Sequence, residues 1–221
     1  MSHRCARLAT GIALAALTVF LTALNADAEE RRVTVRVYDA GDGTPSMRAE
    51  AIRIAAAIVE QAGIAADWHD CTDESVRQEC QDARRSLNFV VRFMPRFVPA
   101  GHGSHIALET KTTSGTQQSE LGFAIIDPNT LVGAMATIYH DRVLAVARRA
   151  GVERSELLGR ALAHEVGHLL LQATGHSPSG LMRAVWTDEE LTQNRADDWL
   201  FTTADRLRLQ RNLNGASGPA Q

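Results

Sequence analysis

Two histidines, His164 and His168, lie four positions apart in an apolar stretch that favours a helix. On an α-helix their imidazoles would project from one face and could bind the same metal ion. Glu165 directly follows the first histidine, where its carboxylate could accept a proton from a water molecule activated by the ion. These residue types at this spacing, the pattern HExxH, are typical of zinc-assisted hydrolysis.

A third ligand is expected, because catalytic zinc usually has three protein ligands and one open position. His176 is the first candidate, and it follows Gly175, whose φ could be positive at a helix end. If the helix continued to Gly175, His176 would lie about 10 Å along the axis from His168, too far to share an ion. The helix must therefore end near residues 171–172, and the chain must turn back.

A carboxylate is the alternative third ligand, as in the zinc enzymes with two histidines and a glutamate. Three acidic residues lie beyond the second histidine: Asp188, Glu189 and Glu190. The same segment also fits a helix N-terminus, with Thr187 as the capping residue and Glu190 three positions later. The spacing favours His176 and leaves the carboxylates open.

Residues 157–182 resemble the metzincin-type zinc metalloproteases, in which a helical HExxH precedes a glycine, a third histidine and a turn with a methionine beneath the metal. The resemblance gives these roles, in order, to His164, Glu165, His168, His176 and Met182. This chain departs from the family pattern, because Leu171 and Thr174 occupy the usual glycine and third-histidine positions. The third histidine is displaced by two residues.

The resemblance also implies a strand that binds substrate. Gly122, Phe123 and Ala124 belong to a short apolar stretch that could form the edge of a sheet and pair with an extended peptide. An ordinary strand in the core is the alternative.

Residues 1–28 have the three parts of a secretory signal peptide. Arg4 and Arg7 supply positive charge, residues 11–24 are almost entirely apolar, and residues 26–28 form a small-x-small cleavage site. An uncleaved anchor is the alternative, although the apolar stretch is short for a span of about 20 residues. The sequence thus predicts an exported protein, periplasmic or secreted, with no stable membrane insertion after cleavage.

Export bears on the cysteines, because oxidising compartments favour disulfides. Cys5 leaves with the signal peptide, and Cys71 and Cys80 remain. We expect these two to form a disulfide. Two free thiols, or ligands of a second metal, are the alternatives.

The elements that must position the site follow from periodicity, turn residues and caps. Strands are expected at residues 33–38, 65–69, 87–93, 122–126 and 135–139. Helices are expected at residues 45–62, capped by Thr44 with Pro45 in the first position, at 143–150, from the cap Ser155 through the motif, and at 197–213. This order predicts an α+β fold: a mixed, mostly parallel sheet with a backing helix and the motif helix, followed by a helical C-terminal part. A single zincin-like catalytic domain would span 29–213, with a flexible tail at 214–221.

The sequence therefore predicts a zinc metalloendopeptidase-like hydrolase with Zn²⁺ as cofactor and Glu165 as general base. Its partner would be a peptide or protein substrate. A nucleic-acid partner is not expected, since the formal net charge is −3 and no basic patch is present. A monomer is expected. Two alternatives stay open: a non-catalytic, zinc-stabilised extracytoplasmic binding module, and a zinc hydrolase of non-peptide amides.

Overall fold

The computed structural model describes residues 32–41, 43–73, 75, 77–81, 87–95, 121–127 and 133–215. The expected signal peptide and residues 216–221 of the expected tail lie outside these ranges. Among the described helices, none combines the length and the apolar character needed to cross a bilayer.

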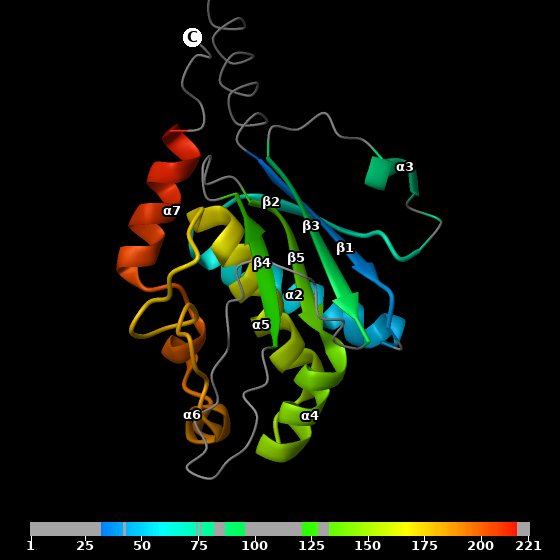
Figure 1. The fold of residues 1–221 in the computed structure, drawn as a ribbon, viewed down its shortest axis with the longest axis vertical. Helices are drawn as coiled ribbons and strands as arrows, with labels where there is room; N and C mark the ends of the chain where they lie inside the picture. The colour runs from blue at the N-terminus through cyan, green and yellow to red at the C-terminus, as the bar shows by residue number, and fades with distance from the viewer. Residues whose placement is uncertain are drawn as a thin grey trace, which may run out of the picture.

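Five strands form one sheet with the order β2-β1-β3-β5-β4 (Figure 1). They are β1 (Val33–Asp39), β2 (Ala66–Asp70), β3 (Leu87–Met94), β4 (Gly122–Ile126) and β5 (Gly133–Tyr139). The pairs β1–β2, β1–β3 and β3–β5 are parallel, and β4 runs antiparallel to β5 at one edge. The expected mixed, mostly parallel sheet is confirmed.

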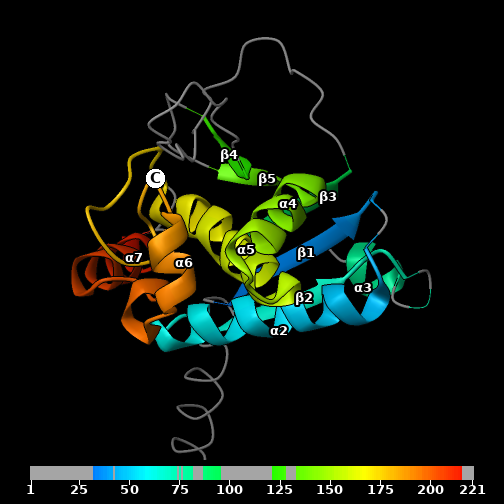
Figure 2. The same ribbon diagram turned by 90° about the horizontal axis from the view of Figure 1, so that it is seen from below.

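Two long helices, α2 (Pro45–Gln61) and α5 (Arg154–Leu171), pack on the same face of the sheet (Figure 2). The shorter helices are α3 (Arg77–Gln81), α4 (His140–Ala150), α6 (Asp188–Gln193), the 3₁₀ turn η2 (Ala196–Trp199) and α7 (Thr203–Gly215). Every residue of α5 from Leu157 onward is buried. The motif helix is therefore the centre of the core, which explains why its sequence is apolar on nearly all sides.

Local sequence signals set most helix ends, and some ends of α4, α5 and α7 differ from expectation. Thr44 caps α2 and Pro45 begins it, as expected. However, Glu153 rather than Ser155 caps α5, because its carboxylate accepts hydrogen bonds from the backbone N–H groups of Ser155 and Glu156. Helix α4 begins earlier than expected, at His140. The helix expected at 197–213 is interrupted: the 3₁₀ turn η2 ends at Trp199, Leu200 is extended, and α7 begins only at Thr203. Helix α7 then continues to Gly215, into the segment expected to be a flexible tail.

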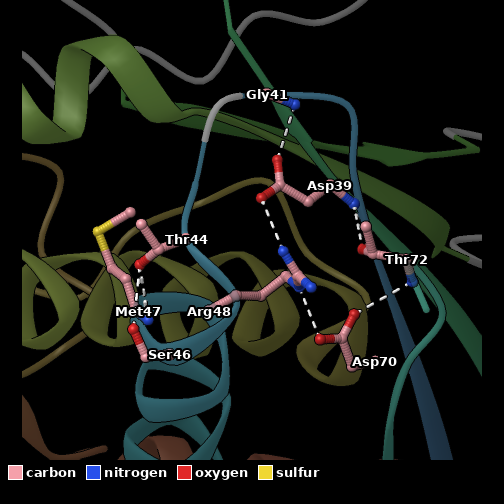
Figure 3. A network of polar contacts seen from close by, with 8 residues as sticks. All are labelled: Asp39, Gly41, Thr44, Ser46, Met47, Arg48, Asp70 and Thr72. Carbon is pink, nitrogen blue, oxygen red and sulfur yellow. Dashed lines mark hydrogen bonds and ion pairs between the residues drawn. The ribbon is translucent and has the colours of Figure 1, made fainter.

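A buried ion-paired network fixes the start of α2 against the ends of β1 and β2 (Figure 3). Arg48 lies 3.3 Å from Asp39 Oδ2 and 2.6 Å from Asp70 Oδ2. The side chains of Arg48 and Asp39 are 7% and 2% exposed, so each charge needs its partner. The expected Cys71–Cys80 disulfide is present just after β2. These contacts hold in place the helix against which α5 packs.

Candidate metal centre

Three imidazoles converge beside α5. One ring nitrogen from each of His164, His168 and His176 lies within 4.8 Å of the others. The first two rings come from successive turns of the helix, and the third comes from the loop that follows it. Within the described ranges, this is the group of His, Cys, Asp and Glu side chains close enough to hold one ion.

The third histidine reaches the cluster because α5 ends at Leu171. Gln172 then adopts the left-handed conformation, with φ 50° and ψ 41°, and turns the chain back. The helix thus ends where the histidine spacing requires it. The expectation of a positive φ at Gly175 is wrong, since Gln172 makes the turn instead. A non-glycine residue there costs about 1–2 kcal/mol, which other contacts of the folded chain must offset.

Backbone carbonyls fix the tautomers of the two helical histidines. The Nδ1 atoms of His164 and His168 lie 2.8 Å from Leu181 O and 2.9 Å from Ala173 O. A carbonyl can only accept, so each Nδ1 carries the proton and each Nε2 presents a lone pair. The two Nε2 atoms are 3.1 Å apart. Nitrogens of a tetrahedral zinc with bonds of about 2.0–2.1 Å are separated by about 3.3 Å, so this spacing fits zinc.

His176 completes a nitrogen donor set that suits the same ion. Its Nε2 is buried and has no hydrogen-bond partner in the described part of the chain. A buried ring nitrogen without a partner is unfavourable unless something binds it. Three neutral imidazoles are a ligand set found in catalytic zinc sites, where an open position completes the coordination.

Burial keeps these imidazoles neutral. Loss of solvation, followed by the nearby His168 ring, lowers the pKa of His164 well below its ordinary value. Loss of solvation is also the largest influence on His168, whose pKa falls from 6.5 to about 4, and it lowers the pKa of His176. Only the neutral ring can bind a metal, so the site is ready for one at neutral pH.

We expect the metal-free protein to lose stability as the pH falls from about 6.5 to about 4. The unfolded chain takes up the proton of His168 first, because the folded-state pKa is the lower one. Above its unfolded-state pKa, His168 does not change the free energy of unfolding. Near pH 4 it lowers that free energy by its full amount, about 3 kcal/mol. Urea unfolding across this range measures the loss. In a His168→Ala variant the pH dependence should be shallower, and an equal slope in both proteins would contradict the assignment.

Met182 lies directly against the motif helix. It is fully buried, and a Cβ built on Gly167 would lie 2.6 Å from Met182 Sδ and 2.8 Å from Phe201 Cε1. Any side chain at position 167 would therefore displace the methionine. The backbone of the preceding residue, Leu181, holds His164. Met182 thus packs against α5 at Gly167, the residue before His168. Its role beneath a bound metal stays a prediction.

Glu165 is buried on α5 and faces the edge strand. A Cβ on Gly122 would lie only 2.8 Å from Glu165 Oε1, so the strand backbone passes directly over the carboxyl group. Within the described sheet β4 is the last strand. The segment holding Phe123 and Ala124 is therefore at the edge rather than between two strands. Gly122 and Glu165 lie far apart in the sequence, so their contact is visible only in the structure.

The three alternative carboxylates have other partners. Asp188 pairs with Arg149, Glu189 accepts a hydrogen bond from Gln193, and Glu190 forms a capping box with Thr187 and an ion pair with Arg183. None of the three belongs to the cluster of histidines. The geometry therefore favours His176 as the third ligand, and the acidic segment serves as the start of α6.

Several groups that hold the site have no signal in the sequence. The carbonyls of Ala173 and Leu181 belong to the backbone, so residue type does not reveal them. Trp186 packs edge-on against His164, with ring centres 5.6 Å apart, although its sequence context suggests only a core or rim aromatic residue. His102 and His105 belong to a Gly/Ser-rich sequence that indicates a solvated loop rather than a second metal site, and both lie outside the described residues.

No protein-family model and no curated protein matches the chain. Among solved structures, archaemetzincin from Methanopyrus kandleri is similar over 83% of this chain and 97% of its own, with 15% identity and a TM-score of 0.48. A zinc-dependent peptidase from Methanocorpusculum labreanum is similar over 79% and 99%, with 14% identity and a TM-score of 0.47. Both TM-scores lie below 0.5, so the chemistry assigned to this chain rests on the geometry of its own histidines and of Glu165.

Proposed function

We propose that this chain is a zinc-dependent metallopeptidase, in which His164, His168 and His176 bind the ion and Glu165 is the general base. One observation carries the proposal. Three imidazoles bring one ring nitrogen each within 4.8 Å of the others, and the buried Glu165 lies on the same helix as two of them. A purely structural role for the histidines would leave two lone pairs facing each other at 3.1 Å without a cation.

Zinc bound at the three histidines would act as a Lewis acid, polarising a peptide carbonyl and lowering the pKa of water toward neutrality. Glu165 accepts the proton of the attacking water and delivers it to the leaving amine. The carbonyls of Leu181 and Ala173 keep the imidazoles in the binding tautomer throughout. The chain's own contribution is thus orientation of the ligands and transfer of one proton.

The edge strand supports an extended peptide as substrate. A peptide that pairs with β4 would pass beside Gly122, whose missing side chain leaves the Glu165 carboxyl close to the strand. The exposed Ile125 and the half-buried Phe123 alternate with the buried residues of β4. They would contact apolar substrate side chains. Binding along the strand, away from the peptide's ends, is what an endopeptidase requires.

We further infer that the protein is exported after loss of its signal peptide, as a monomer without stable membrane insertion or a nucleic-acid partner. The Cys71–Cys80 disulfide agrees with an oxidising compartment.

The direct test is cleavage of an unstructured protein such as casein by the purified chain, with and without a zinc chelator. We expect one zinc per chain and cleavage that stops on chelation and returns with added zinc. Bound zinc without cleavage of casein would refute the peptidase and favour the non-catalytic module or a hydrolase of other amides. Cleavage that survives complete removal of metal would refute the mechanism.

A further inference from the structure

The His176 ring differs from its two partners in how it is held. The rings of His164 and His168 each donate a hydrogen bond to a backbone carbonyl. No hydrogen bond to another described residue orients the ring of His176, which sits on a loop rather than on α5. Its position must therefore be set by the backbone on either side of it.

Ser177, the next residue, is fixed at two points. Its backbone N–H donates to Met182 O at 2.8 Å, which closes the loop between the third histidine and the methionine. Its hydroxyl donates to Asp205 Oδ1 at 2.6 Å. The loop is also joined to the chain before α7, because Leu181 N–H donates to Leu200 O at 2.8 Å. The hydroxyl contact is thus a side-chain contact of the residue that directly follows His176.

The two carboxylate oxygens of Asp205 accept hydrogen bonds from two different residues. Oδ1 accepts from Ser177, and Oδ2 accepts from the hydroxyl of Thr202 at 2.6 Å and from its backbone N–H at 3.1 Å. Asp205 N–H in turn donates to the Thr202 hydroxyl, which completes a capping box at the start of α7. Asp205 is 1% exposed. A buried carboxylate with all these donors in place is held rigidly.

We propose that Asp205 is a positioning residue for the metal site, acting through Ser177 to hold His176 where it can bind the ion. The inference rests on the proposed zinc site. The buried carboxylate connects the capped end of α7 to the loop that carries the third ligand, so the C-terminal helix contributes to metal affinity without touching the metal. Groups that orient a ligand in this way change metal affinity about 10–100-fold when removed.

The test compares two substitutions, each of which removes one hydroxyl group that donates to the Asp205 carboxylate. Ser177→Ala removes the contact to the metal loop and keeps the cap of α7, whereas Thr202→Val removes the hydroxyl of the cap and keeps the contact to Ser177. We expect Ser177→Ala to weaken zinc binding about 10-fold or more in competition with a chromogenic chelator. Thr202→Val keeps the Ser177 contact and the Thr202 N–H to Asp205, so it should weaken zinc binding clearly less than Ser177→Ala does. It should lower the Tm of the metal-free protein by about 2–4 °C.

A double-variant cycle shows whether Asp205 acts through Ser177. If Asp205→Ala folds, it should weaken zinc binding, and it should weaken it little further once Ser177 is already alanine. Unchanged zinc affinity in Ser177→Ala overturns the proposal, as does a loss in both single variants that simply follows their fall in Tm. If the unaltered chain binds no zinc, the proposed function itself has failed, which is a different result.

Discussion

Replacing Glu165 by glutamine is expected to abolish peptide cleavage while leaving zinc in place. Glutamine has the size of glutamate, so it fits the buried space beside Gly122. Its amide cannot accept a proton from water, and general acid–base catalysis of this kind contributes about 10²–10⁴-fold to a rate. Casein cleavage and the zinc content of the same sample are the two measurements.

The matched control is Glu189→Gln, which makes the same change at an exposed carboxylate of α6. Glu189 accepts a hydrogen bond from Gln193 and is not in the histidine cluster. Cleavage by this variant should equal that of the parent. If Glu165→Gln also retained parent activity, Glu165 could not be the base. If Glu165→Gln lost its zinc, the Glu165 carboxylate would be needed to keep the metal ligands in place.

The sequence predicted those parts of the fold that depend on local pattern. The alternating residues of β1 and the long apolar helix around the motif were evident, because burial on one or on all sides leaves a period in the sequence. The end of α5 near Leu171 followed from chemistry rather than propensity. Three imidazoles can share an ion only if the helix stops in time, and the structure ends it there.

Features that depend on the assembled molecule were not predictable in the same way. The left-handed turn was expected at a glycine, yet Gln172 makes it, because the contacts around the cluster outweigh its local preference. Glu153 caps α5 in place of Ser155, since several nearby residues could cap and only the structure decides among them. The approach of Gly122 to Glu165 joins segments far apart in the chain.

The choice of third ligand gives the second large expected effect. His176→Ala should bind zinc more than about 100-fold more weakly than the parent, because it removes a ligand itself, whereas groups that only orient ligands are worth about 10–100-fold. Glu190→Ala should keep the zinc. It should destabilise the metal-free protein by about 1 kcal/mol, because it breaks the capping box with Thr187 and the ion pair with Arg183. Measurements of zinc content and of competition with a chelator distinguish the two candidate third ligands.

Stability measurements sharpen this comparison, because zinc binds only the folded chain. At a zinc concentration about 100-fold above its Kd, binding adds about 2.7 kcal/mol to the free energy of unfolding. This gain should be present in the parent and in Glu190→Ala, and absent in His176→Ala at the same zinc concentration. Without metal, His176→Ala should be no less stable than the parent, because the substitution removes a buried nitrogen that has no hydrogen-bond partner within the described structure. A full zinc-dependent gain in His176→Ala, with loss of that gain in Glu190→Ala, would instead make the carboxylate the ligand.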